Sequence, residues 1–296
     1  MDTANVFSCP LCGAKEHRQF HQLVSFGVKV NYYQCKTCGF VFQNSAESQA
    51  GDPAFYAQTY RKIYQKTELP TAKDLRQQRL RAEEGMRFLK ENGVTKLSRT
   101  LDIGASSGLF LEYLQSAFGA EPIGVEMGQA YRDEAASKGI TMFANLEALK
   151  ASTFSAFELV SLMHVLEHLN DPIGNLIEIR QHFLSADGYL LVEVPNLYAH
   201  DSFELAHLSC FTPHTLKQSL AKSGYELIRL KAHGYPRSKT LKLFLTALAR
   251  PKPQNDAPFH FVYEKNVATK RQMGFLWRKL ITKVCPKQTW LPLEDK

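Results

Sequence analysis

Four of the six cysteines form two matched pairs near the start of the chain. Two residues separate Cys9 from Cys12, two separate Cys35 from Cys38, and a glycine follows each pair. This spacing lets a tight turn direct both sulfurs at one point, and glycine permits the backbone of such a turn. The pattern predicts a tetrahedral zinc site, with alternating apolar residues over 24–32 forming strands between the turns. Because four thiolates leave no position for water, we expect the zinc to be structural.

Two other interpretations of these cysteines are less favoured. A redox motif of the thioredoxin type would need one pair beside a strand and a helix rather than two pairs in a ribbon. Disulfides are rare in the cytoplasm, which is the expected compartment. The N-terminal residues lack the basic and apolar regions of a secretory signal, and no apolar run is long enough for a membrane helix.

A second group of residues indicates a nucleoside site. Asp102, Gly104 and Gly108 share a short turn after an apolar strand, and the two glycines let backbone approach a ligand. Glu126 ends the next strand, where a carboxylate accepts hydrogen bonds from a ribose diol. A nicotinamide cofactor is disfavoured because the turn lacks the full G-x-G-x-x-G pattern. Asp102 instead suits a cationic ammonium, which S-adenosylmethionine carries.

Histidines after two later strands could serve a reaction. His207 lies in a loop where an acceptor would reach the cofactor, and a neutral imidazole has a suitable pKa for a general base. The alternative is that His207 supports the helix expected to begin near residue 213. His164, Glu167 and His168 match the H-x-x-E-H pattern of a metalloprotease family. We disfavour a catalytic metal there because the sequence identifies no third ligand, and we expect His168 to pack or to cap a helix.

These residues require an alternating α/β framework to position them. Strands are expected near 100–104, 123–126, 140–143, 159–163 and 189–194, with helices near 75–91, 109–118, 129–138, 145–151 and 172–184 between them. Segments 225–230 and 241–248 add two edge strands. The expected fold is therefore a doubly wound, mostly parallel seven-stranded sheet of the Rossmann-like type, with a small N-terminal zinc ribbon. The expected divisions are a ribbon at 1–45, a linker and helical lid at 46–95, a cofactor domain at 96–250 and a basic extension at 251–296.

Charge is concentrated at the end of the chain. The net charge is +7, and residues 265–296 carry +6 of it. This segment is expected to form an amphipathic helix closing over the core, although it could also bind RNA, acidic lipid or a phosphorylated substrate. Tyr56, Tyr60 and Tyr64 recur every four residues and predict a helical stripe that either packs in the core or covers a ligand.

Four segments resemble the successive motifs of class I S-adenosylmethionine-dependent methyltransferases. They are LDIGASSGLF at 101–110, GVE at 124–126, FELVSLMHVLEHLNDP at 157–172 and DGYLLVEVPN at 187–196. With the cysteine ribbon, the chain is similar to bacterial sugar C-methyltransferases. The family usually has glycine where this chain has Ser106. In the similar loop of those enzymes a glutamate precedes the histidine, and here Ala206 takes its place, so that Glu204 is the candidate substitute.

The resemblance implies a role for each matching residue. Asp102, Gly104, Ser106 and Gly108 would hold the methionine end of the cofactor. Glu126 and Met127 would hold the ribose, Asn145 would flank the adenine and His164 would lie near the methyl donor. Tyr60 would cover the cofactor, and His207, Glu204 and His164 are the catalytic candidates.

Three functional classes follow from these patterns. The first is methylation of a small cytoplasmic metabolite, with a nucleotide-linked sugar favoured. The second is a ribosomal RNA methyltransferase that uses the zinc module and the basic tail to bind RNA. The third is a zinc-ribbon binding protein without activity, which the intact cofactor residues disfavour. The sequence gives no information on the oligomeric state.

Overall fold

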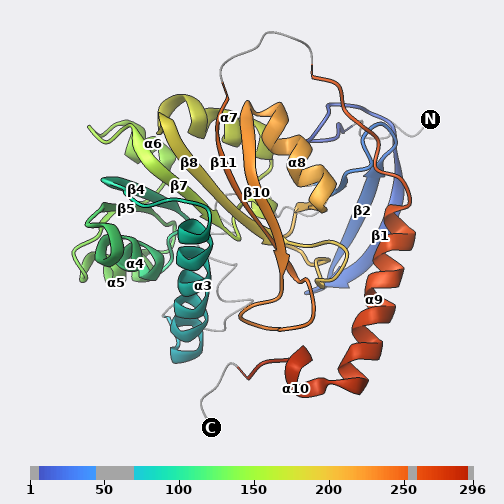
Figure 1. The fold of residues 1–296 in the computed structure, drawn as a ribbon. Helices are drawn as coiled ribbons and strands as arrows, with labels where there is room; N and C mark the ends of the chain where they lie inside the picture. Colours follow the sequence, from blue (N-terminus) through green and yellow to red (C-terminus); the bar gives the residue numbers. More distant parts are fainter. Residues whose placement is uncertain (1–6, 45–69, 253–258, 293–296) are drawn as a thin grey trace.

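The computed structural model describes residues 7–44, 70–252 and 259–292. A large twisted sheet flanked by helices lies beside a small sheet formed mainly by the first strands of the chain, which are blue in Figure 1. The stripe of Tyr56, Tyr60 and Tyr64 lies outside the described residues, so the prediction of a tyrosine lid stays a prediction.

The large sheet has seven strands in the order β10-β11-β8-β7-β4-β5-β6. The pairs β6-β5, β5-β4, β4-β7 and β7-β8 are parallel, whereas β11 is antiparallel to both of its neighbours. The prediction of a mostly parallel, doubly wound sheet is thus confirmed. The strands are β4 (Arg99–Ile103), β5 (Glu121–Val125), β6 (Thr141–Phe143), β7 (Phe157–Met163), β8 (Leu184–Pro195), β10 (Tyr225–His233) and β11 (Phe244–Pro251).

One strand prediction is wrong in position. The sequence places segment 241–248 at a sheet edge, but β11 begins at Phe244 and lies between β8 and β10. Its first six residues are buried, which is the pattern of a strand covered on both faces. Only β10 and β6 are edges of this sheet.

Helices cover both faces of the sheet, as the buried apolar residues show. Leu159 and Leu191 pack with α3 and α4, whereas their chain neighbours Val160 and Leu190 pack toward α7 and α8. This alternation follows from the two-residue period of a strand. The helices are α3 (Ala72–Glu91), α4 (Leu109–Phe118), α5 (Gln129–Ala136), α6 (Leu146–Lys150), the short 3₁₀ helix η2 (Leu166–His168), α7 (Pro172–His182), α8 (Pro213–Lys222), α9 (Val267–Val284) and α10 (Pro286–Thr289).

Local signals set the ends of α3, the helix that forms one wall of the site. The Thr71 hydroxyl accepts from the amide of Asp74, and the Asp74 carboxylate accepts from the amide of Thr71, which is a capping box. Asn92 caps the other end, and Gly93 follows with a φ of 82°. The helix therefore ends at Glu91, as expected for the segment near 75–91.

The small sheet joins two distant parts of the chain. Its antiparallel order is β1 (His17–Ser25), β2 (Val28–Cys35), β3 (Val41–Gln43) and β9 (Ser209–Cys210). The last of these strands belongs to the segment between β8 and α8. The N-terminal strands and the loop that carries Glu204 and His207 therefore share one sheet.

The basic C-terminal segment forms the long helix α9, drawn in red in Figure 1. Arg271 donates to the carbonyl oxygen of Leu197, and Arg278 donates to that of Ala199. Both arginines thus turn toward the protein. No helix within the described ranges is long and apolar enough to cross a membrane.

Candidate active site

A cavity of about 320 Å³ opens where β4, β7 and β8 end. Open α/β sheets bind their ligands at this edge, and the volume is in the range of small-molecule sites. The sequence-predicted residues that line it are Asp102, Gly104, Ser106, His164, Glu204 and His207. The fold therefore brings together candidates from three separate segments of the chain.

The loop after β4 presents its backbone to the cavity. Gly104 has a φ of 77°, and a Cβ there would stand 2.4 Å from a methyl carbon of Val165. Ser106 also has a positive φ, of 50°. A residue with a Cβ rarely adopts this conformation, and such strain is concentrated at ligand sites. Ser106 thus keeps the glycine-like backbone of the residue that it replaces.

Asp102 lies at the bottom of this loop, 4% exposed. The Ser161 hydroxyl donates a hydrogen bond of 2.6 Å to its carboxylate. Burial raises the pKa of Asp102 to about 7; the bond from Ser161 opposes the shift, and the charge of Glu126 adds to it. A cationic ligand group in the cavity would stabilise the ionised form of this carboxylate.

Glu126 connects the loops at the ends of two adjacent strands. One of its carboxylate oxygens accepts from the amide of Ser106 over 3.0 Å, and the other accepts from the amide of Gly128 over 2.7 Å. These bonds hold Glu126 against the loop after β4, although it is not itself among the residues that line the cavity. Its role toward a ribose stays a prediction.

Three further cofactor candidates also lie outside the cavity lining. Gly108 precedes α4 with a φ of 75°, and a Cβ there would meet Ile140 at 2.4 Å. Met127 is 39% exposed beside Glu126. Asn145 caps α6, because its side chain accepts from the amide of Ala148. Their contacts with a cofactor stay predictions.

His164 lies directly after β7 with a φ of 60°, a second strained residue in the cavity wall. Its Nε2 is 3.0 Å from Glu193, and its Nδ1 is 3.4 Å from Glu167. Burial would raise the pKa of Glu193, but hydrogen bonds from His164 and His233 outweigh it and lower that pKa. His164 therefore connects two buried carboxylates.

Glu204 and His207 form a close pair on the other side of the cavity. Nε2 of His207 is 2.8 Å from Glu204, and Nδ1 is 3.0 Å from the carbonyl oxygen of Ser202. Burial would lower the pKa of His207, but the hydrogen bond with Glu204 and its charge raise it. Both ring nitrogens contact acceptors, so His207 alone is not placed to take a proton while Glu204 keeps this position. The candidate general base is therefore the Glu204–His207 pair rather than His207 alone. The side chain of Glu204 is 30% exposed.

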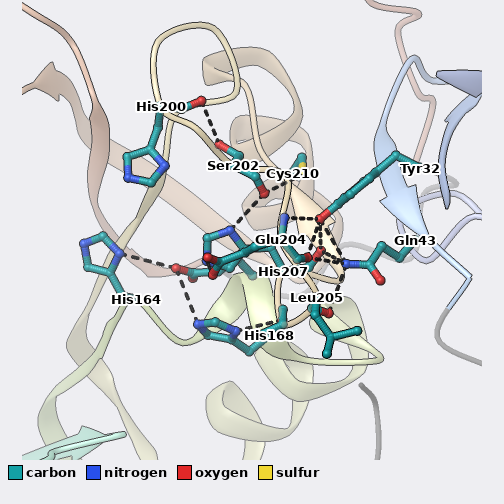
Figure 2. Close-up of polar contacts among 12 residues, drawn as sticks. Tyr32, Gln43, His164, His168, His200, Ser202, Glu204, Leu205, His207 and Cys210 are labelled. Carbon is teal, nitrogen blue, oxygen red and sulfur yellow. Dashed lines mark hydrogen bonds and ion pairs between the residues drawn. The ribbon is translucent and has the colours of Figure 1, made fainter. Parts of the chain in front are cut away.

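The small sheet holds the loop that carries this pair. The Tyr32 hydroxyl donates toward the carbonyl oxygens of Glu204 and His207 and accepts from the amide of Glu204. The Gln43 side-chain nitrogen donates toward the carbonyl oxygens of Glu204, Leu205 and His207. Figure 2 shows both side chains reaching from the N-terminal strands into this loop. Two side chains from β2 and β3 thereby position the candidate acid and base groups.

The four paired cysteines meet in one cluster at the other end of β2. The sulfur atoms are 3.7 Å apart for Cys9 and Cys38 and 3.5 Å apart for Cys12 and Cys35. Four sulfurs bound tetrahedrally at 2.3 Å from zinc are about 3.8 Å apart, so the spacing fits that ion. All six cysteines lie in described segments, and none forms a disulfide.

Sequence reasoning missed several residues of the site. Glu193, Gln78 and Arg81 are close to the predicted groups but had no assigned role. A signal existed for Glu193, a charged residue inside the apolar strand LLVEV. The others come from segments that meet only in the folded chain.

The strand order, the glycine loop and the cavity at the strand ends define a class I methyltransferase fold. The model of the methyltransferase domain family matches residues 71–230, more than half of the chain. The chain therefore belongs to this family and is an S-adenosylmethionine-dependent methyltransferase.

Solved structures agree with this fold. The plantazolicin methyltransferase BpumL, in complex with a monoazolic desmethylPZN analog and SAH, is 14% identical with a TM-score of 0.51, covering 67% of this chain and 94% of its own. The PH0226 protein of Pyrococcus horikoshii OT3 is 13% identical with a TM-score of 0.50, covering 66% of this chain and 99% of its own. No curated protein sequence matches the chain. These identities are low, so they establish the fold alone.

Proposed function

We propose that the protein methylates a small molecule held between the loop after β4 and the Glu204–His207 pair. The observation that supports this is one cavity lined at one side by Asp102, Gly104 and Ser106 and at the other by the pair. S-adenosylmethionine supplies a methyl group on a positively charged sulfur, and a nucleophile in line with that bond displaces it. Oriented proximity of this kind can contribute about 7–11 kcal/mol to catalysis.

The cofactor would be held by residues at two strand ends. Asp102 would face the ammonium group, because its buried carboxylate needs a positive charge to stay ionised at neutral pH. Gly104 would let the backbone approach, since even a Cβ there would occupy the space beside Val165. Glu126 would receive the ribose hydroxyls, since bonds from the amides of Ser106 and Gly128 hold its carboxylate against the loop after β4.

The cavity walls favour a polar, small acceptor. Gln77, Gln78 and Arg81 of α3 line it together with His200. Such donors and acceptors suit a compound rich in hydroxyl groups, such as the substrates of the sugar C-methyltransferases that the sequence resembles. RNA is less favoured because Arg271 and Arg278 of the basic helix donate to loop carbonyl oxygens of the protein itself.

The Glu204–His207 pair would receive the proton of the acceptor. Glu204 is the exposed member, while His207 is anchored through Nδ1 to the Ser202 carbonyl oxygen. Glu204 and Nε2 of His207 are 2.8 Å apart and can share one proton. The buried ring would therefore stabilise Glu204 when it takes the proton of the acceptor.

We further propose that the cysteine cluster holds a structural zinc ion and that residues 1–45 form the module built around it. Four thiolates complete a tetrahedral shell, so this ion would support the fold and leave the chemistry to the cavity. The module would act on the reaction through Tyr32 and Gln43, which hold the loop of Glu204. The division into a helical segment at 46–95, a cofactor domain at 96–250 and a basic extension at 251–296 is part of the same proposal.

Incubation with methyl-labelled S-adenosylmethionine and a size-fractionated cell extract tests this function. We expect label in the small-molecule fraction, and less of it with Gly104→Val, which would clash with Val165 and strain the loop after β4. Label found only in large material and removed by ribonuclease would contradict the proposal. Circular dichroism of the variant distinguishes a blocked cavity from a misfolded chain.

A further inference from the structure

Two buried carboxylates beside His164 differ in how they are partnered. Glu193 is 2% exposed and accepts hydrogen bonds at both oxygens. Glu167 is 1% exposed, and neither of its oxygens has a hydrogen bond within the described parts of the chain. Ring nitrogens of His164 and His168 stand 3.4 and 4.0 Å from it. A buried carboxylate in this state calls for a further ligand, because desolvation without a hydrogen bond is costly.

Two histidines near Glu167 are oriented as metal ligands are. Nδ1 of His168 is 2.8 Å from the carbonyl oxygen of Ala206, and Nδ1 of His207 is 3.0 Å from that of Ser202. A ring nitrogen that donates to a backbone carbonyl fixes the tautomer, so that Nε2 is the nitrogen that can bind a metal. In His207 this Nε2 contacts Glu204 over 2.8 Å, and a bound ion would take the place of that contact. The two ring centroids are 5.0 Å apart. The rings belong to different segments of the chain, which can be followed in Figure 2.

We propose that Glu167, His168 and His207 bind a divalent transition-metal ion, separate from the ion of the cysteine cluster. One ligand atom from each residue lies within 4.8 Å of the others. Ligands of one zinc ion at 2.0–2.2 Å are about 3–4 Å apart, so small side-chain movements bring all three onto an ion. His207, from a separate loop, would complete a ligand set with Glu167 and His168 of the H-x-x-E-H motif. The proposal thus adds a metal-binding role to the packing or helix-capping role expected of His168.

The site would be open toward the substrate. Glu167, His168 and His207 all line the cavity, and Glu204 lies 2.8 Å from Nε2 of His207. Two imidazoles and one carboxylate form the ligand set of catalytic zinc and of non-haem iron sites, in which exchangeable positions remain. An oxygen of the acceptor would occupy such a position.

The next step rests on the proposed function. A metal ion at this site favours an acceptor that has a hydroxyl group and is methylated on oxygen. The ion lowers the pKa of the hydroxyl that it binds, and Glu204 takes the proton. The oxygen then forms a bond to the methyl carbon while the bond from that carbon to sulfur breaks. Its electron pair stays on sulfur, giving S-adenosylhomocysteine, and Glu204 returns the proton to water.

Cobalt(II) binding to the full chain, with zinc already in the cysteine cluster, tests the site. We expect one further equivalent of cobalt, with visible bands but without the thiolate charge-transfer bands of a sulfur site. Glu167→Gln and His168→Gln should each weaken cobalt binding by at least about 100-fold, since loss of an outer partner alone costs 10–100-fold. Glu193→Gln is the matched control, because it removes a buried carboxylate next to His164 but outside the ligand set.

The outcomes separate this inference from the proposed function. No further cobalt, or unchanged cobalt affinity in both Glu167→Gln and His168→Gln, overturns the metal site. If labelled product still forms in that case, the methyltransferase function stands without the ion. Cobalt binding that depends on Glu167, together with no labelled small molecule, overturns the acceptor assignment but supports the metal site. Thermal melting of each variant identifies any loss of binding caused by unfolding.

Discussion

The N-terminal strands connect two clusters of potential metal ligands. One is the cysteine cluster, and the other consists of Glu167, His168 and His207. The first is built from two short turns, and its four sulfurs would form a complete ligand shell for one ion. The second would offer three ligands from two loops, and it faces the cavity. A full shell of thiolates suits a structural metal, whereas an incomplete shell of imidazole and carboxylate suits a metal that meets substrate. Strands β2 and β3, through Tyr32 and Gln43, join the two.

The largest effect is expected from removing a ligand of the closed cluster. Cys38→Ser should lose the zinc ion and unfold the N-terminal strands, because metal binding in small modules supplies most of their folding free energy. Methyl transfer should then fall below detection, as the loop of Glu204 loses its support. Elemental analysis and thermal melting measure this. Cys285→Ser, outside the cluster, should keep both zinc and melting temperature; full zinc content in Cys38→Ser would contradict the assignment.

A change at the open cluster should affect turnover while the fold is kept. His207→Gln is expected to lower kcat by about 100-fold or more, because it removes both a proposed metal ligand and the partner of the base Glu204. Its cofactor affinity should be unchanged, because Asp102 and the loop after β4 lie on the other side of the cavity. Calorimetry with S-adenosylhomocysteine and steady-state kinetics separate the two effects. His214→Gln serves as the control, because this half-buried ring contacts the carbonyl oxygen of Val262 and does not line the cavity; equal turnover in both variants would return His207 to a structural role.

The connection between the clusters can be weakened without removing either one. Tyr32→Phe deletes the hydroxyl that contacts Glu204 and His207 and leaves buried backbone groups without a partner. We expect a loss of about 1–3 kcal/mol in the free energy of unfolding. Zinc content should be unchanged, and turnover should fall by about 10-fold. Denaturant titration and kinetics measure the two quantities. Wild-type turnover in a destabilised Tyr32→Phe would show that the loop does not need this support.

The smallest effect is expected for cofactor affinity, at the side of the cavity that belongs to neither cluster. Burial raises the pKa of Asp102 to about 7, so its carboxylate is ionised above that pH and protonated below it. Since the cofactor ammonium pairs with the ionised form, affinity should fall by about tenfold as the pH is lowered from 8 to 6. Asp102→Asn should bind weakly at every pH, without this dependence. A flat profile in the wild type would remove Asp102 from the ammonium site.

How far the sequence predicts this molecule depends on how local each feature is. Cys9 and Cys12 belong to one turn, and the strand periodicity near residues 100 and 160 is equally local, so both are readable without the fold. The central place of β11 is not, because segment 241–248 carries no sign of which strands flank it. The third ligand, His207, is 39 residues from His168 along the chain and joins it only when the β8 to α8 loop folds back. Ser106 illustrates a different limit, since its positive φ follows from the loop as a whole.

The pairing of β3 with β9 bears on how this protein can be engineered. A shortened chain that begins at the methyltransferase motifs would expose an unpaired strand edge and the carbonyl oxygens that Tyr32 and Gln43 now satisfy. The N-terminal ribbon is therefore not an independent module that could be removed or exchanged between enzymes. A chimeric enzyme that receives this ribbon would also have to receive the loop of residues 196–212, so that the two are exchanged together.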